Sequence, residues 1–214
     1  MPRIEHRRVP ANGRRGRSGP QRELRRRLLI VCEGVETEPN YFRAFPVPAQ
    51  VEVRVKGEGR STTSLVKAAE AHAEYARRSG DPFDEVWVVF DKDDFTDAQF
   101  NQAEAMVSGK RGQNWNAAWS NPCFELWFLL HFQDVEACLH QSVIVEKLER
   151  WLTGYHKGDR GMYRRLLPKQ SDALRRAEAL VRDHEVQPAA RIEPARAGPC
   201  TMVHRLVASL NREL

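Results

Sequence analysis

The chain has 214 residues, 41% of them hydrophobic, and its 34 basic and 29 acidic residues give a formal net charge of +5. This length and hydrophobic content predict one globular domain and exclude a fibrous protein. Because the sequence has neither an apolar run near the roughly 18 residues of a membrane span nor the apolar core of a signal peptide, we expect a soluble cytoplasmic protein.

The positive charge is concentrated near the N-terminus. The first 30 residues contain ten arginines and two glutamates, a net charge of +8, which leaves 24 basic and 27 acidic residues, a net charge of −3, for the remainder. Residues 1–26 are rich in Arg, Gly and Pro and poor in apolar residues, so we predict a disordered tail followed by a single domain at 27–214. The tail is either a solvated leader or an electrostatic arm that neutralises phosphates.

Four segments of the domain have the apolar patterns of β-strands. Residues 28–32 and 85–90 are continuous apolar runs, which are typical of strands buried on both faces. Residues 51–55 alternate between apolar and polar as a half-buried strand does, and residues 116–120 are a further candidate.

Segments with the periodicity of α-helices lie between these predicted strands. Residues 61–78 place apolar side chains at helical intervals, and Pro39 suits the first turn of a helix that follows the first strand. A third helix is predicted from residue 98 onward. Candidate helix-capping residues are Thr37, then Thr62 or Thr63, then Asp94 or Asp97.

After Pro122 the pattern is helical only. The predicted helical segments are residues 124–132, 143–152, 171–184 and 201–214. Strands that alternate with helices, followed by helices alone, predict an α/β fold in which a small parallel sheet is flanked by helices and joined to a helical C-terminal portion.

Three acidic residues follow the ends of two predicted strands. Glu33 comes directly after the first strand, and Asp91 and Asp93 come at the end of the third. Parallel strands gather functional groups at their carboxyl ends, so these carboxylates converge if the two strands are neighbours. Two carboxylates about 4 Å apart repel by roughly 4 kcal/mol, and a hard cation such as Mg²⁺ or Mn²⁺ would offset this repulsion. The alternative is that an aspartate simply caps the next helix.

Four segments carry a resemblance to known proteins. They are "LLIVCEGVETEPNYF", "VWVVFDKDDF", "AWSNPCFELWFLLHF" and "TMVHRLV". A glutamate after the first strand and a DxD after the third resemble the TOPRIM domain of primases, topoisomerases and OLD-type nucleases. The four segments together resemble the RloB family over nearly everything after the tail. The resemblance implies a TOPRIM-like, metal-dependent nuclease of DNA or RNA, with transfer RNA among its candidate substrates, that acts with an RloA-like ABC-type ATPase in anti-phage defence.

The resemblance also implies roles for particular residues. Glu33 matches the TOPRIM glutamate, a metal ligand or general base, and Asp91 and Asp93 match its metal-binding pair. OLD-type nucleases add an acidic residue after a later strand and a lysine near the scissile phosphate, for which Glu125 and Lys157 are the candidates here, although the spacing differs from the OLD pattern. Glu125 is alternatively a charge that caps the start of a helix at Ser120, Asn121 or a nearby N–H.

Two other classes of function remain open from the sequence. The DKDD segment partly fits the start of haloacid-dehalogenase phosphatases, with Ser120 as a second-motif residue, but Phe95 stands where that motif has Thr or Val. A non-catalytic subunit that binds nucleic acid or a partner protein is the second alternative. Oligomeric state is open.

Several further residues have a structural and a functional interpretation. Residues 56–63 are a plain loop or a phosphate cradle, and residues 155–165 mix aromatic and cationic side chains as a solvated helix face or a nucleic-acid groove does. We expect His131 and His204 to be core histidines. The scattered cysteines are expected to be reduced packing residues: Cys32, Cys123, Cys138 and Cys200.

Overall fold

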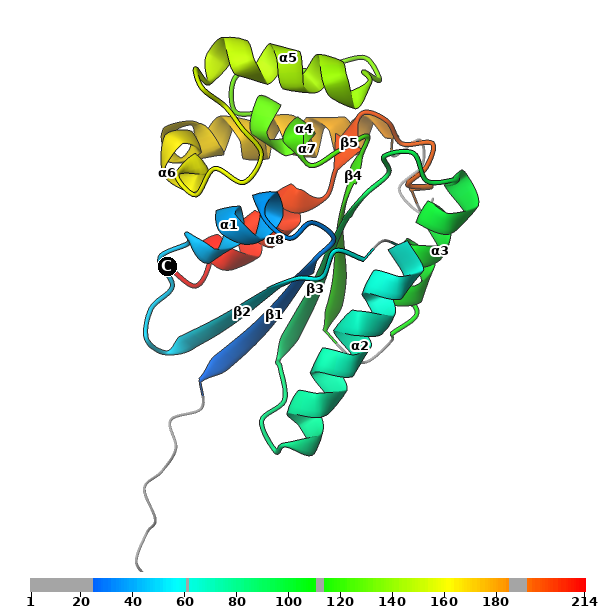
Figure 1. Cartoon of the computed structure of the whole chain (residues 1–214), viewed down its shortest axis with the longest axis vertical. Helices are drawn as coiled ribbons and strands as arrows, with labels where there is room; N and C mark the ends of the chain where they lie inside the picture. Colours follow the sequence, from blue (N-terminus) through cyan, green and yellow to red (C-terminus); the bar gives the residue numbers. More distant parts are fainter. Residues whose placement is uncertain (1–24, 61, 111–113, 185–191) are drawn as a thin grey trace, which may run out of the picture.

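The protein is represented by a computed structural model that describes residues 25–60, 62–110, 114–184 and 192–214. Its sheet has the strand order β2–β1–β3–β4–β5, in which the first four strands run parallel and β5 runs antiparallel to β4 (Figure 1). The strands are β1 (Arg26–Cys32), β2 (Val51–Gly57), β3 (Glu85–Asp91), β4 (Trp115–Asn121) and β5 (Cys200–Thr201). The predicted tail at residues 1–26 lies almost wholly outside the described residues.

Helices cover both faces of the sheet. On one face lie α2 (Thr62–Arg78) and α3 (Asp97–Ser108). The other face is covered by α1 (Thr37–Arg43) and α8 (Val203–Asn211). The same core includes residues of α4 (Glu125–Leu129), α5 (Gln141–Trp151), α6 (Met162–Leu166) and α7 (Gln170–His184), and the 3₁₀ helix η1 (Leu167–Lys169) joins α6 to α7. Figure 1 shows α4 to α7 gathered beyond the carboxyl ends of the strands. The predicted α/β architecture with a helical C-terminal portion is confirmed.

The central strands are buried because helices cover both of their faces. All of β3 and every residue of β1 except Arg26 are buried, which explains their continuous apolar runs. Alternate residues of the two strands enter two separate cores, one beneath α2 and α3 and one beneath the remaining helices. Because β1 and β3 are packed on both faces, their carboxyl ends are held firmly in the sheet. The residues at and after these ends, Glu33 and Asp91, are therefore held in fixed positions.

Some local predictions were wrong. Thr37 is the first residue of α1, which is preceded by Glu36 without a side-chain cap, and α3 is capped by Thr96 rather than by Asp94 or Asp97. Thr96 and Gln99 form a capping box, so the neutral pair satisfies the amides that an aspartate was expected to bind. α2 begins at Thr62, so neither Thr62 nor Thr63 precedes it; the residue before it lies outside the described ranges.

The C-terminal portion also differs in detail. α4 has only five residues, and the segment 201–214 starts its helix at Val203 because Cys200 and Thr201 pair with β4. Cys32, Cys123 and Cys200 are buried as expected of packing residues, whereas Cys138 is exposed. No helix in the described part of the chain is long and apolar enough to cross a membrane.

Candidate functional site

Glu33 and Asp91 meet at the carboxyl ends of two neighbouring strands. β1 pairs directly with β3, with Cys32 opposite Val89. The Glu33 amide donates to the Val89 carbonyl oxygen at 2.9 Å, and the Asp91 amide donates to Glu33 Oε2 at 3.3 Å. The backbone of the sheet therefore holds the Glu33 carboxylate beside the end of β3.

Asp91 carries a buried carboxylate oxygen that has no protein partner. Its side chain is 9% exposed; Oδ2 accepts a hydrogen bond from the Phe124 amide at 2.9 Å, while Oδ1 has no hydrogen-bond partner in the described structure. Burial raises the pKa of Asp91 well above its usual value, and the nearby carboxylates of Glu38, Asp93 and Glu125 raise it further. A buried oxygen without a partner is costly, so this position favours a bound proton or cation.

Asp93 lies at the mouth of the same site in an unusual backbone conformation. Its φ of 35° is in the left-handed region, which aspartate adopts more readily than most residues. The Asp93 amide donates to the Pro122 carbonyl oxygen at 2.9 Å, and the Lys92 amide donates to the Ser120 carbonyl oxygen at 2.8 Å. The turn after β3 is thus fastened to the end of β4, with its aspartate exposed beside the buried Asp91.

Glu125 and Lys157 form an ion pair over this edge of the sheet. Glu125 is only 3% exposed, and its Oε1 lies 3.3 Å from Lys157 Nζ and 3.3 Å from the Tyr155 hydroxyl, which donates to it. These contacts are to side chains of the α5–α6 loop, not to the backbone of Ser120 or Asn121 as in the capping alternative. Burial lowers the pKa of Lys157, but the Glu125 and Asp93 carboxylates more than offset this and raise it.

Glu38 is a further acidic residue of the site that the sequence reading missed. It lies in α1, is 6% exposed, and accepts a hydrogen bond from the Gly34 amide at 3.0 Å. A Cβ at Gly34 would collide with the Glu38 carboxylate, so glycine allows this close approach. The missed signal is helical spacing: Glu38 precedes the buried Tyr41 and Phe42 by three and four residues, which places it on the buried face.

One cavity of about 260 Å³ collects these side chains. Its lining includes all five site residues predicted from the sequence, together with Glu38: Glu33, Asp91, Asp93, Glu125, Lys157 and Glu38. With Glu36, which also lines the cavity, six carboxylates therefore face a single lysine. The oxygen donors suit Mg²⁺ or Mn²⁺, and the unpartnered Asp91 Oδ1 offers a ligand position. Within the described ranges no three Asp, Glu, His or Cys side chains already form a metal-ligand cluster, so binding requires side-chain rotation.

The loop after β2 supports Glu33. The Glu58 amide donates to the Cys32 carbonyl oxygen and the Gly59 amide donates to the Glu33 carbonyl oxygen, both at 3.0 Å. These amides are thus occupied in holding the end of β1, which favours the structural interpretation of residues 56–60. Ser61 lies outside the described residues.

Other candidates from the sequence are structural. Tyr155 and Tyr163 are buried, so they cannot stack on nucleobases at the surface. His131 and His204 are core histidines as expected: their Nδ1 atoms lie 2.9 Å and 2.8 Å from backbone carbonyl oxygens of the preceding turns. The hydroxyl of Ser120 is buried against that of Thr201 at 3.0 Å, which argues against a phosphatase motif at this residue.

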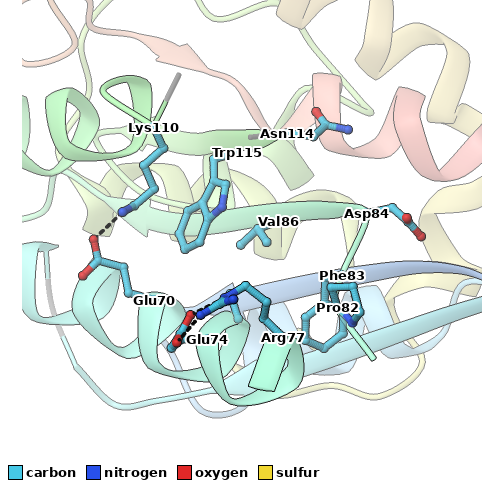
Figure 2. A pocket seen from close by; sticks show the side chains of 11 residues that line it. Glu70, Glu74, Arg77, Pro82, Phe83, Asp84, Val86, Lys110, Asn114 and Trp115 are labelled. Atoms are coloured by element: carbon cyan, nitrogen blue, oxygen red, sulfur yellow. Dashed lines mark hydrogen bonds and ion pairs between the residues drawn. The ribbon is translucent and has the colours of Figure 1, made fainter. Parts of the chain in front are cut away.

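A larger cavity of about 620 Å³ lies near the amino ends of β3 and β4 (Figure 2). Two of its carboxylates are paired with cations: Glu70 with Lys110 at 2.5 Å, and Glu74 with Arg77 at 2.7 Å. The Lys110 ammonium also lies 4.8 Å from the centre of the Trp115 ring. Because these carboxylates already have cationic partners, this cavity is a poorer cation site than the one at the carboxyl edge.

Metal-free protein is expected to lose stability as the pH rises toward 7. Burial, with a smaller contribution from Asp93 and Glu38, raises the pKa of Glu33 from 4.5 to about 7. Between these values the folded chain binds more protons than the unfolded chain, so the free energy of unfolding falls as pH increases through this window. Thermal melts in EDTA from pH 5 to pH 8 measure the effect, and Glu33→Gln should flatten the dependence. An unchanged slope in Glu33→Gln would show that Glu33 does not titrate in this way.

Comparison with known proteins identifies one family. The family model described as "RloB-like protein" matches residues 28–210, which include every residue of the site. Neither the curated proteins nor the solved structures contain a match to the chain.

Proposed function

Since this chain belongs to the RloB-like family, we propose that it hydrolyses phosphodiester bonds of DNA or RNA with the help of a divalent metal ion. The observation that supports this proposal most strongly is the cavity at the carboxyl edge of the sheet. It combines several carboxylates, one lysine and a buried Asp91 oxygen without a hydrogen-bond partner. Such a donor set suits a hard cation that works on phosphate oxygens.

The side chains around the cavity divide into metal ligands and groups that act on the substrate. Glu33, Asp91, Asp93 and Glu125 are the proposed ligands of Mg²⁺ or Mn²⁺, and Glu38 lies close enough to support them. The ion would supply a positive charge and an activated water for attack on phosphorus. The pKa of Glu33 is about 7 in the metal-free protein, and a bound cation would lower it and favour the ionised carboxylate that a ligand requires.

Lys157 is the proposed phosphate-binding residue. Its side chain is 61% exposed, and its Nζ contacts the buried Glu125, so the ammonium lies between the carboxylates and solvent. In this position it can neutralise a substrate phosphate as the phosphate approaches the acidic cavity. Without such a cation, the carboxylates would repel the substrate.

The biological setting of the activity is proposed from the family resemblance. We propose that the nuclease acts in anti-phage defence together with an ABC-type ATPase. The Arg-rich segment before Arg25 is proposed to bind the nucleic-acid backbone through its charge. Transfer RNA is among the candidate substrates.

A cleavage assay tests the proposed function. Protein stripped with EDTA is incubated with plasmid DNA, single-stranded DNA and total RNA, with Mg²⁺, Mn²⁺ or no metal, and with or without the ATPase. We expect cleavage of at least one polynucleotide only when metal is present. Hydrolysis of a phosphomonoester such as p-nitrophenyl phosphate, with every polynucleotide left intact, would instead support the phosphatase alternative.

A further inference from the structure

β2 is an edge strand: among the described residues no other strand pairs with its outer side. It pairs with β1 in register from Val51 to Gly57, and it is the last strand on that side of the sheet (Figure 1). The Arg26 amide donates to the Gln50 carbonyl oxygen and the Glu58 amide donates to the Cys32 carbonyl oxygen. Even-numbered residues of β2 therefore direct their backbone groups toward β1, and odd-numbered residues direct theirs outward.

Some of the outward groups are already bonded. The Val51 amide donates to the Pro48 carbonyl oxygen at 2.9 Å, and the Val55 carbonyl oxygen accepts from Arg43 Nη2 at 3.2 Å. Within the described ranges, no partner is found for the Val51 carbonyl, the Val53 amide and carbonyl, or the Val55 amide. The two donors are the amides of Val53 and Val55, and the two acceptors are the carbonyl oxygens of Val51 and Val53. These four groups are arranged symmetrically about Val53 if a second strand pairs antiparallel to β2.

The sequence of this edge is also symmetric. Residues 51–55 read Val-Glu-Val-Arg-Val, so an antiparallel copy centred on Val53 places valine opposite valine and Glu52 opposite Arg54. We propose that β2 pairs with β2 of a second copy of this chain about a two-fold axis at Val53. The two donors and two acceptors of each copy then form four hydrogen bonds across the axis, and the two sheets become one continuous sheet.

The side chains complement one another on both faces of the proposed pair. Glu52 and Arg54 are 31% and 51% exposed, and in this register they lie in the non-hydrogen-bonded pairs, where side chains approach most closely. Within one chain Glu52 contacts both the buried Arg27 at 3.1 Å and Arg54 at 2.5 Å. Arg27 keeps Glu52 in place, and in the dimer Arg54 exchanges its contact with Glu52 of the same chain for Glu52 of the second copy. On the opposite face the three half-buried valines extend the core across the axis.

Sedimentation velocity tests the pairing in the absence of any nucleic acid, so its outcome is independent of the proposed nuclease activity. We expect wild-type protein at micromolar concentration to sediment as a dimer, with twice the 24.6 kDa mass of one chain. In the proposed dimer, Glu52 of each copy lies opposite residue 54 of the other. Arg54→Glu therefore creates two pairs of opposed negative charges and should raise the dissociation constant at least 100-fold. Lys56→Glu is the matched control: it makes the same charge change on the same face, but residue 56 lies opposite Gln50, and the dissociation constant should change less than threefold.

A second variant keeps the test decisive if Arg54→Glu affects folding. Val53→Pro removes one outward N–H that makes no bond to β1, and proline is tolerated on edge strands. We expect it to be monomeric and to keep the far-UV circular dichroism spectrum of the wild-type fold, with a melting temperature lowered by the loss of the dimer contact. A wild-type protein that is monomeric at 100 µM would overturn the proposal. So would a dimer that survives both Arg54→Glu and Val53→Pro, because its contact would then lie elsewhere.

Discussion

Asp91→Asn is expected to abolish metal-dependent cleavage, with a loss of roughly 10³-fold or more, while the fold stays intact. The asparagine oxygen can still accept the hydrogen bond from the Phe124 amide that Asp91 Oδ2 accepts at 2.9 Å. Its amide group replaces the unpartnered Oδ1 and removes a negative charge that Glu38, Asp93 and Glu125 oppose. The melting temperature in EDTA should therefore stay equal or rise.

Two measurements on Asp91→Asn check this result. The cleavage rate should fall to background, and the Mn²⁺-dependent rise in melting temperature seen in wild-type protein should disappear. Asp94→Asn is the matched control, because Asp94 is exposed and does not line the cavity. If Asp91→Asn cleaved within threefold of the wild-type rate, Asp91 would not be a metal ligand.

Lys157→Met is expected to lower stability and Glu125→Gln to leave it nearly unchanged, while both lower activity to a similar extent. Removing Lys157 leaves the buried Glu125 carboxylate without its cation, and we expect a loss of about 1–2 kcal/mol, less than for a fully buried pair because the lysine is 61% exposed. Glu125→Gln keeps the contact to the Tyr155 hydroxyl and releases an exposed lysine to water, so the melting temperature should change little. Each variant should lower cleavage about 100-fold.

The double variant distinguishes a pair from two independent residues. In Lys157→Met/Glu125→Gln no buried charge is left unpaired, so stability should return close to the wild-type value while cleavage stays lost. Unfolding in urea and cleavage rates of all four proteins provide the comparison, with the exposed Lys67→Met as the control for losing a lysine. Additive losses of stability would show that the ion pair does not couple the two residues.

The sequence predicted what depends on local pattern. Apolar runs located β1 and β3, alternation located β2, and β4 was a further candidate. The positions where β1 and β3 end placed Glu33 and Asp91 at one edge of the sheet. Glu38 was missed because a carboxylate in the first turn of a helix usually faces solvent, and its burial depends on α4 and on the α5–α6 loop far along the chain. Tyr155 was interpreted as a possible surface aromatic for the same reason. Its hydrogen-bond partner Glu125 is 30 positions away in the sequence, so no local pattern indicates that Tyr155 is buried.

Non-local contacts also explain the missed strand. β5 has only two residues, which is too short for any alternation to be visible, and it is a strand only because β4 lies beside it. The cap of α3 was a different kind of error. Thr96 and Gln99 have the spacing of a capping box, which is a local signal, but the prediction named only the neighbouring aspartates.

The pairing of β4 with β5 determines when the site can be completed during folding. The Met202 amide donates to the Trp119 carbonyl oxygen at 2.8 Å, and the Ser120 and Thr201 hydroxyls meet across 81 positions of sequence. The segment that follows β4 carries the Phe124 amide that holds Asp91. Closing a long loop costs more chain entropy than closing a short one, so we expect this pairing to form after the contacts between β1, β2 and β3. During synthesis, every proposed metal ligand therefore leaves the ribosome before residues 200–202 do. Until those residues emerge, β5 cannot pair with β4, and that side of the site lacks its support.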